Sequence, residues 1–306
     1  MIELKQVSKT FDSTTVIKDI SLSIQPGEVV GFLGPNGAGK TTTVRMIAGV
    51  LPPSKGQVLV NGQDFFSEDV SQHGQVGYLP ENNPIYDDMT VEEFLKFWAK
   101  IKKITPTDSE QKIKKAVEAA GLRDVFYRPI IELSKGYRQR TGLAQAILAE
   151  PEILLLDEPT EGLDPNQRRE IHDLIKGIGK KRTVIICSHV LSEITRMCSR
   201  IIIINKGQIV ADSPTSQLDK LASGQQSYEF VASGKDIKTD LKALPGLDTI
   251  EQSKEDVGHR FYLTTSSDED LRLPIFELAK TKNWKLYELT RRQVDLEDIF
   301  TKLTQE

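Results

Sequence analysis

The chain has 306 residues, more than one typical domain needs, and its 38% hydrophobic and 27% charged residues are the composition of an ordinary globular protein. Lys and Arg number 40 against 44 Asp and Glu, so the formal net charge is −4, and such a chain is poorly suited to gripping a nucleic-acid backbone over a broad surface. Its longest runs of Ile, Leu and Val, at Ile153–Leu156 and Ile201–Ile204, fall far short of the about 20 apolar residues of a membrane-spanning helix, and its first residues lack the pattern of a signal peptide.

The first 210 or so residues alternate short aliphatic runs with helical patterns, which predicts α/β layering. Val29–Leu33 is predicted to be a buried strand that leads through a glycine-rich turn into a helix at Thr41–Val50. Unbroken aliphatic strands are typical of a sheet that is covered on both faces. Three more such strands are predicted, at Glu152–Leu156, Thr183–Cys187 and Arg200–Ile204.

A more helical stretch separates the first two of these strands, over about residues 82–150. Within it, Val91–Trp98 and Ile113–Val117 carry apolar residues at helical spacing. The polar segment Asp212–Gln226, rich in Pro, Ser and Gly, favours a linker, which we place at residues 216–226. The sequence therefore predicts a first domain over residues 1–215 and a separate one over residues 227–306.

The order of elements in the second domain is βαββαβ, which predicts a small α+β domain of the ferredoxin-like type. No catalytic pattern is found in it, and we expect an accessory or regulatory domain. A further helix at Leu296–Leu303 is predicted to close it. The predicted strands are Ser227–Val231, Thr249–Ser253, Arg260–Thr264 and Trp284–Leu289, and the helices are Asp236–Ala243 and Asp270–Ala279.

The strongest motif is Gly34-Pro35-Asn36-Gly37-Ala38-Gly39-Lys40-Thr41, which fits G-x-x-x-x-G-K-[ST] at every fixed position. Its glycines let the backbone wrap around phosphate with successive N–H groups pointing inward, and the following helix adds its positive N-terminal end. Lys40 would reach the β- and γ-phosphates of a nucleotide, and the Thr41 hydroxyl would coordinate Mg²⁺. The alternative is a glycine-rich turn that matches by chance, but the strand before it and the helix after it argue against that.

The strand that ends in Asp157-Glu158 supplies two carboxylates, a kind of group that the phosphate loop itself lacks. Its carboxylates lie at the sheet edge where parallel sheets place their ligand sites. Asp157 would hold the metal, and Glu158 is the natural general base for a water that attacks the γ-phosphorus. An acidic pair after a strand is, by itself, more often a turn; its combination with a phosphate loop favours the functional interpretation.

The segment Leu133–Arg140 precedes a run of helix formers. Ser134 is a credible N-cap and Gly136 permits a close approach, so this helix start is a second candidate anion site. A plain capped helix is the simpler alternative when the segment is considered alone.

Taken together, the first domain resembles the ATP-binding subunit of ABC transporters, over about two-thirds of the chain. The resemblance rests on an ordered set of motifs: the phosphate loop Gly34–Thr41, the signature segment Leu133–Arg140, the strand ending in Asp157-Glu158, the turn Glu161–Asp164, and Ser188-His189. It implies the P-loop NTPase fold of an ABC ATPase domain with a helical subdomain.

The resemblance also implies roles for single residues. Phe11 stands where the family has the aromatic that stacks on adenine, although a plain core Phe is the alternative. His189 matches the switch histidine at the γ-phosphate, although a lone His is more often structural. Glu158, His189 and Lys40 are the expected catalytic residues, and Thr41, Asp157 and Glu81 the expected Mg²⁺ ligands. ATP is expected to contact Phe11, Gly34, Pro35, Asn36, Gly37, Ala38, Gly39, Lys40, Thr41, Thr42, Glu81, Ser134, Gly136 and Asp164.

Departures from the family pattern indicate a branch. Glu81 replaces the usual Gln after the strand Val76–Leu79, and it adds a negative charge beside the phosphates. Lys135 and Tyr137 replace the usual Gly and Gln of the signature, and Glu161 stands where Ser is common. These features resemble the ABC-2-type exporters, of the gliding-motility-associated and multidrug or polysaccharide-export kinds.

One phosphate loop and one signature in the chain imply a homodimer or heterodimer of ATP-binding subunits, with two ATP molecules sandwiched between the partners. The resemblance further implies a separate six-helix membrane permease as partner, no nucleic acid, and a location at the cytoplasmic face of the plasma (inner) membrane. Only two cysteines, Cys187 and Cys198, are present, which fits a reducing compartment.

Two rival functions are disfavoured by the same sequence. A soluble ABC ATPase that acts on nucleic acid or the ribosome would need long coiled coils or a second ATPase domain, yet the interval Thr42–Leu133 has no sustained heptads and only one such domain is present. A regulatory module that no longer hydrolyses ATP is opposed by the retention of Lys40, Asp157, Glu158 and His189, with Glu81 the one feature in its favour.

Overall fold

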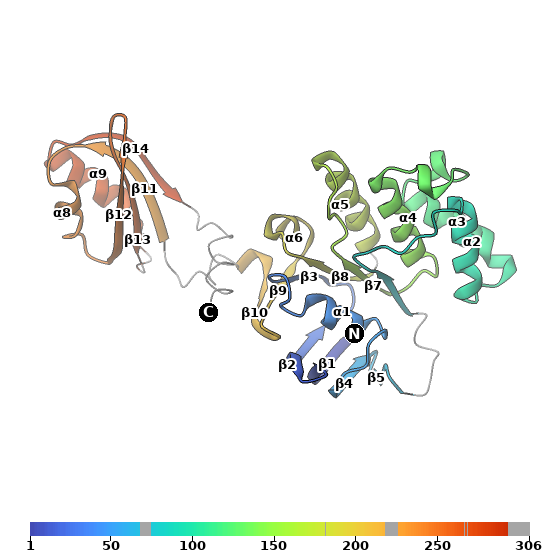
Figure 1. Cartoon of the computed structure of the whole chain (residues 1–306). Coiled ribbons are helices and arrows are strands. Elements are labelled where there is room, and N and C mark those ends of the chain that lie inside the picture. Colours follow the sequence, from blue (N-terminus) through green and yellow to red (C-terminus); the bar gives the residue numbers. More distant parts are fainter. Residues whose placement is uncertain (68–74, 181, 218–225, 266, 268, 293–306) are drawn as a thin grey trace. The chain divides into compact units, whose positions relative to one another are not determined.

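The computed structural model describes residues 1–67, 75–180, 182–217, 226–265, 267 and 269–292. Contacts divide the chain into two compact units, Met1–Thr215 and Ser216–Glu306 (Figure 1). Each unit has a hydrophobic core of its own. In the part of the chain that the structure describes, no helix is long and apolar enough to cross a membrane.

The larger unit is built on a six-stranded sheet with the strand order β10-β9-β3-β8-β7-β6. The strands from β9 to β6 are parallel, and β10 pairs with β9 in the antiparallel direction. Every residue of β7 and β8 is buried, as their unbroken aliphatic composition predicts. The strands are β3 (Val29–Leu33), β6 (Val76–Leu79), β7 (Ile153–Asp157), β8 (Thr183–Ser188), β9 (Arg200–Asn205) and β10 (Gln208–Pro214).

A second, antiparallel sheet of order β2-β1-β4-β5 accompanies it, and it is not among the elements predicted from the sequence. Its strands bury Ile2, Leu4 and Val58 in the same core as Val44 and Ile47 of helix α1. The sheet thus covers the helix that follows the phosphate loop. The elements are β1 (Ile2–Phe11), β2 (Thr14–Ile24), β4 (Lys55–Val60), β5 (Gln63–Asp64) and α1 (Lys40–Ile47).

Two helices accompany the last parallel strands. Helix α5 (Pro165–Gly179) follows β7, and helix α6 (Leu191–Met197) follows β8. Ile194 of α6 lies directly against Gly31 of β3, where a larger residue would collide with it. The parallel sheet is therefore packed closely against α6 at the strand that leads into the phosphate loop.

The predicted helical subdomain is inserted between β6 and β7, which are neighbours in the sheet. It consists of α2 (Val91–Ile101), α3 (Pro106–Ala119), two short 3₁₀ helices (Arg123–Val125 and Ile130–Glu132) and α4 (Lys135–Ile147). Thr90 and Glu93 form a reciprocal capping box that fixes the start of α2. As predicted, Ser134 caps α4 by accepting a hydrogen bond from the Tyr137 N–H.

The smaller unit has the predicted ferredoxin-like arrangement. Its four strands pair antiparallel in the order β12-β13-β11-β14, and its two helices intervene in the chain as predicted. Phe230 and Phe261 stack at its centre with ring centroids 4.9 Å apart. The predicted helix Leu296–Leu303 lies outside the described residues. The elements are β11 (Gln226–Ser233), α8 (Ile237–Leu241), β12 (Leu247–Glu255), β13 (Gly258–Thr265), α9 (Arg272–Thr281) and β14 (Lys285–Arg292).

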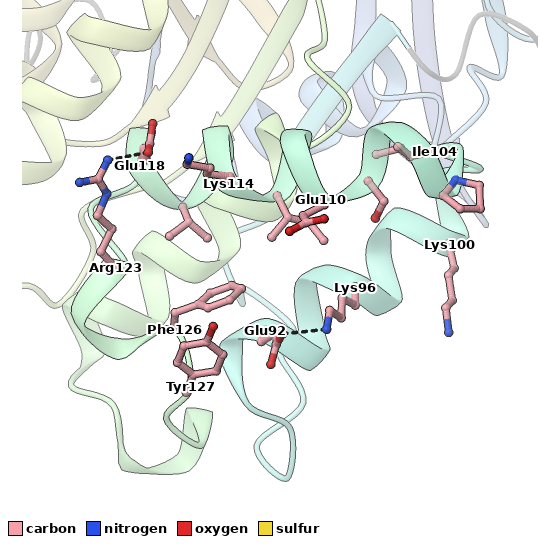
Figure 2. A pocket seen from close by; sticks show the side chains of 14 residues that line it. Glu92, Lys96, Lys100, Ile104, Glu110, Lys114, Glu118, Arg123, Phe126 and Tyr127 are labelled. Atoms are coloured by element: carbon pink, nitrogen blue, oxygen red, sulfur yellow. Dashed lines mark hydrogen bonds and ion pairs between the residues drawn. The ribbon is translucent and has the colours of Figure 1, made fainter.

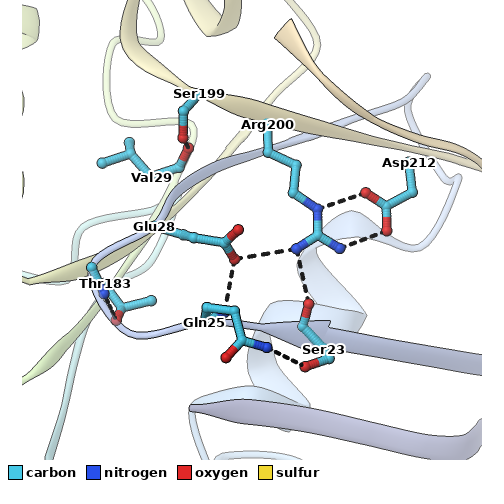
Figure 3. Close-up of polar contacts among 9 residues, drawn as sticks. Ser23, Gln25, Glu28, Val29, Thr183, Ser199, Arg200 and Asp212 are labelled. Atoms are coloured by element: carbon cyan, nitrogen blue, oxygen red, sulfur yellow. Dashed lines mark hydrogen bonds and ion pairs between the residues drawn. The ribbon is translucent and has the colours of Figure 1, made fainter.

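Arg200 joins several elements at the edge of the larger unit (Figure 3). Its guanidinium donates two 2.7 Å hydrogen bonds to the carboxylate of Asp212, one of 2.9 Å to the Ser23 carbonyl and one of 3.2 Å to Glu28. Asp212 to Pro214, the first residues of the polar segment noted in the sequence, therefore form the end of β10 and pair with β9. The segment that we placed at residues 216–226 lies largely outside the described residues.

Because each unit has a hydrophobic core of its own, we expect the larger unit to fold without the smaller one. A chain cut to residues 1–217 should unfold in one cooperative calorimetric transition within a few degrees of that of the larger unit in the full chain. A control cut at residue 207 removes β10 and the Asp212 partner of Arg200, and it should lower that midpoint by about 5 °C or more, because a bidentate, partly exposed ion pair and a ladder of hydrogen bonds are lost. A residue 1–217 fragment without a cooperative transition would contradict the independence of the units.

Candidate functional site

The loop between β3 and α1 has the backbone that its glycines predict. Gly37 and Gly39 have φ of 78° and 110°, in the left-handed region that favours glycine. Gly39 is the N-cap of α1, and Ile17 of β2 lies against its α-carbon, so that a side chain there would be obstructed. The side chain of Lys40 is buried, and its ammonium donates to the carbonyls of Gly34 at 2.7 Å and Pro35 at 3.2 Å.

A cavity of about 320 Å³ opens beside this loop. It unites the loop with the ends of three neighbouring strands, which bring Glu81 after β6, Glu158 after β7 and His189 after β8. Its volume is within the range of small-molecule sites. The lining residues are Val16, Asn36, Gly37, Gly39, Lys40, Thr41, Thr42, Glu81, Glu158, Glu161 and His189.

Thr41 and Asp157 meet at the base of this region. The Thr41 hydroxyl donates a 3.2 Å hydrogen bond to Asp157 Oδ1. Asp157 is fully buried, and its Oδ2 atom has no hydrogen-bond partner among the described residues. Burial, reinforced by the nearby charges of Glu81 and Glu158, raises the pKa of the Asp157 carboxyl to about 6. A buried carboxylate oxygen without a partner, next to a hydroxyl, is a donor set that suits a hard cation.

Glu158 and His189 form the second pair. His189 Nδ1 lies 3.0 Å from Glu158 Oε1, and the Glu158 side chain is about 10% exposed whereas that of His189 is 46% exposed. The backbone at Glu158 has a positive φ of 47°, which is uncommon for a residue with a side chain. Its N–H donates to the Cys187 carbonyl of β8 at 2.9 Å. Burial raises the pKa of the Glu158 carboxyl, and the hydrogen bond from His189 offsets part of that rise.

Seven of the residues predicted to contact ATP lie outside the lining of this cavity: Gly34, Pro35 and Ala38 belong to the loop itself, and the other four, Phe11, Ser134, Gly136 and Asp164, come from other elements. Ser134 and Gly136 are at the start of α4, and Asp164 caps α5 by accepting from the N–H groups of Asn166 and Gln167, both at 3.0 Å. Phe11, at the end of β1, is 43% exposed, and the Lys9 ammonium lies 5.3 Å from the centre of its ring. The cavity brings together most of the predicted phosphate-loop residues with Glu81, Glu158 and His189. Its lining does not include Ser134, Gly136, Asp164 or Phe11.

Other residues at or near the site were not predicted from the sequence. Val16 lines the cavity from a strand that was not predicted. Glu193 of α6 is buried and accepts a hydrogen bond of 2.5 Å from Thr160, in the turn that follows Glu158, and one of 3.4 Å from Arg168 of α5. These side chains are distant in sequence and carry no motif, so only the fold reveals the contact.

A larger cavity, of about 1010 Å³, lies in the helical subdomain between α2, α3 and the segment around Phe126 (Figure 2). Ile113 and Val117 form part of its apolar wall, and ion pairs such as Lys96–Glu92 at 2.7 Å lie at its rim. It shares no lining residue with the cavity at the phosphate loop. It carries no phosphate-binding loop and no buried acid, so the chemistry is concentrated in the smaller cavity.

Comparison with known proteins gives the same picture from sequence and fold. Residues 17–161 match the family described as ABC transporter. An uncharacterized ABC transporter ATP-binding protein of Bacillus subtilis, YhcH, is 44% identical over 213 residues, which are 69% of this chain and 68% of that protein. The linearmycin resistance ATP-binding protein LnrL of Bacillus subtilis is 32% identical over 76% of each chain.

Two further similarities extend the comparison. The bacitracin transport ATP-binding protein BcrA of Bacillus licheniformis is 35% identical over 222 residues, or 72% of each chain. A solved ATP-binding subunit of an ABC transporter superposes with a TM-score of 0.65 at 26% identity, over 72% of this chain and 92% of that one. The fold class predicted from the sequence is thereby confirmed.

The raised pKa of Asp157 predicts a pH-dependent gain in stability for Asp157→Asn. The folded state holds the Asp157 proton more tightly than the unfolded state does, so this carboxyl costs no stability below its ordinary pKa of 3.8 and costs increasingly more as the pH rises to about 6. In EDTA and without nucleotide, Asp157→Asn should be more stable than the wild type by about 2 to 3 kcal/mol at pH 7.5, and the gain should shrink toward pH 4.5.

Urea unfolding at the two pH values measures this difference. Asp173→Asn, which makes the same substitution at an exposed position of α5, is the control and should show no such gain. An Asp157→Asn variant that is no more stable than the wild type at pH 7.5 would contradict the burial cost.

Proposed function

This chain belongs to the ABC transporter family, as one of its ATP-binding proteins, and we propose that it binds and hydrolyses ATP to drive export through a separate membrane-spanning partner. The observation that carries the proposal is the 320 Å³ cavity, which residues of the phosphate loop line together with a Glu–His pair, and whose Thr41 hydroxyl donates a hydrogen bond to the buried Asp157 behind it. Each of these groups matches one need of phosphoryl transfer to water.

The loop would hold the nucleotide by its phosphates. Backbone N–H groups from Gly34 to Thr42 and the N-terminal end of α1 supply partial positive charge, and the buried Lys40 supplies a full one. Carbonyls of the same loop already hold the Lys40 ammonium in place, so the binding of a nucleotide would cost this side chain little conformational entropy. Phe11 is exposed enough for its ring to stack on adenine.

The residues around Asp157 fit Mg²⁺. The Thr41 hydroxyl and Asp157 would hold the ion, directly or through water, and Glu81, whose charge is near enough to raise the pKa of Asp157, lines the same cavity as Thr41. Among the described residues no three or more His, Cys, Asp or Glu form a metal cluster, so nucleotide oxygens and water would complete the coordination. The bound ion would neutralise phosphate charge beside the Glu81, Glu158 and Glu161 carboxylates that line the cavity.

Glu158 is placed to act as the general base. Its carboxylate would accept the proton of the attacking water while the bond from the γ-phosphorus to the bridging oxygen breaks, which leaves ADP and inorganic phosphate. Burial raises the pKa of Glu158, which strengthens it as a proton acceptor. His189 orients that carboxylate through its Nδ1 atom, and its exposed ring faces the cavity, where it would contact the γ-phosphate.

The site calls for a second ATP-binding subunit. Ser134 and Gly136 start a helix whose N-terminal end suits an anion, yet neither lines the cavity of its own chain. We propose that they close over ATP held by a facing subunit, identical or related, and that Asp164 lies at the contact between the two. Two ATP molecules would then be shared in one dimer.

The membrane partner is proposed on the names of the relatives and on one surface. The relatives include proteins named for bacitracin transport and linearmycin resistance, which supports the ABC-2-type exporter branch. In the segment after Glu81, Tyr86 is 49% exposed and offers an aromatic contact. We propose a six-helix permease as partner, which would hold this chain at the cytoplasmic face of the plasma membrane, and an accessory or regulatory role for the smaller unit.

Glu158→Gln tests the assignment of the base. The variant should bind ATP with an affinity within about threefold of the wild type, because the loop and Lys40 are intact, but should lose at least about a hundredfold in kcat, the usual contribution of a general base. It should also form a stable dimer with ATP, seen by sedimentation. Colorimetric phosphate release and binding of a fluorescent ATP analogue measure the first two quantities.

Lys40→Ala is the companion variant, because it should lose both ATP binding and turnover. Turnover of Glu158→Gln within threefold of the wild type would exclude Glu158 as the base. A wild-type chain whose phosphate release is no greater than that of Lys40→Ala would instead identify a module that binds ATP without hydrolysing it.

A further inference from the structure

Asn83 lies two residues after Glu81 and contacts the helix that begins at the signature segment. Its side-chain amide donates a 2.8 Å hydrogen bond to the Arg138 carbonyl and one of 3.3 Å to the buried Gln139 Oε1. The backbone of Asn83 has a φ of 37°, in the left-handed region that Asn tolerates better than most residues, and its N–H donates to the Pro80 carbonyl at 3.0 Å. The side chain is thus turned onto α4 by its own backbone conformation.

Gly142 provides the space for Asn83. A β-carbon built at Gly142 would lie 2.6 Å from Asn83 Cγ and 2.7 Å from Leu79 Cδ1, and it would overlap Asn83 Oδ1. Real β-carbons do not make contacts this close. A helix interior pays about 1 kcal/mol for glycine in place of alanine, so the close approach of Asn83 gives this position a physical reason to lack a side chain.

Further bonds fix the same segment along its length. Arg138 of α4 donates a 2.6 Å hydrogen bond to the Asp87 carboxylate. The N–H groups of Ile130 and Ile131 donate to the carbonyls of Met89 and Asp87, at 2.8 and 3.2 Å. The segment 83–89 is therefore bonded to the chain both just before and just after Ser134 and Gly136.

We propose that Asn83, seated at Gly142, is a positioning residue that locks the segment after Glu81 to the start of α4, so that Glu81 at the ATP cavity and the Ser134–Gly136 helix start move as one body. The proposal rests on the function proposed above, in which Ser134 and Gly136 close over ATP on the facing subunit. Bonds on both sides of the signature segment leave its N-terminal end little freedom relative to Glu81. Loss of the lock would let that end tilt without disturbing the phosphate loop.

The test uses the full chain in the Glu158→Gln background, where ATP should hold the dimer together. Asn83→Ala should raise the dissociation constant of the ATP-bound dimer about tenfold, the factor set by about one hydrogen bond, measured by sedimentation. Asn83→Asp keeps the shape of the side chain, but it replaces the amide nitrogen, which donates to the Arg138 carbonyl and to Gln139 Oε1, with an oxygen that can only accept. It should therefore raise the dissociation constant of the dimer at least as much. In both variants the monomer should bind a fluorescent ATP analogue as the parent does.

Gly142→Ala tests whether Asn83 positions the start of α4 or only packs against the helix. Its methyl should lower the thermal midpoint because it collides with Asn83, and adding Asn83→Ala should restore the midpoint but not the dimer. Gly177→Ala, in helix α5 where an added methyl meets nothing within 4 Å, is the matched control: it should leave the dimer constant unchanged and should raise the thermal midpoint slightly rather than lower it, because alanine favours the helix.

The outcomes distinguish the two proposals. Asn83→Ala with a dimer constant within twofold of the parent would overturn the lock, as would a double variant that recovers both midpoint and dimer. A Glu158→Gln parent that stays monomeric with ATP would show that the proposed dimer is wrong, and the lock would fall with it.

Discussion

The pairing of β7 with β8 is the constraint on which the rest of the site depends. Leu156 pairs with Ile186 and Asp157 with Cys187, and the Glu158 N–H continues the ladder by donating to the Cys187 carbonyl. Because parallel strands end at one edge of a sheet, this register places Glu158 beside His189 and Asp157 beside the end of the loop that follows β3. A slip of one residue would exchange the two acids between the sheet interior and the cavity.

The same register explains why the site is costly to fold. Asp157 is fully buried and one of its oxygens has no partner among the residues that the structure describes, Glu158 has an unfavourable backbone conformation, and both carboxyl groups have raised pKa values. The two strands that hold them are buried along their whole length, and that apolar burial stabilises the unit enough to tolerate the local cost. Charge that is unfavourable in the protein alone would become favourable with the proposed cation and polyphosphate in the cavity.

The parallel strands and the phosphate loop were predictable because each carries a local signature: unbroken aliphatic residues, or glycines at fixed spacing. The antiparallel sheet was missed because the register of β1 with β2 shifts several times between Leu4 and Thr10, which breaks the alternation that marks a half-buried strand. The polar composition that begins at Asp212 did not reveal that this residue belongs to β10 and has Arg200 as its bidentate partner. Contacts such as Asn83 with Gly142 join residues far apart in sequence, and only the fold brings them together.

Helix α4 is held from two directions, and this bears on how the incomplete site can be closed. Gln167 of α5 lies against Gly136, within three residues of the Asp164 cap, while the chain around Asn83 holds α4 on its other contact at Gly142. Arg140 also pairs with Glu170 of α5. Helix α5, which follows the turn after Glu158, and the segment after Glu81 therefore both contact α4. In the arrangement proposed above, a change at either acid would reach the helix start through one covalent segment and one set of short contacts, because the hydrogen-bond ladder of the helix resists bending. The helix start, which does not line the cavity of its own chain, is thus joined by short contacts to the elements that follow two of the acids of that cavity.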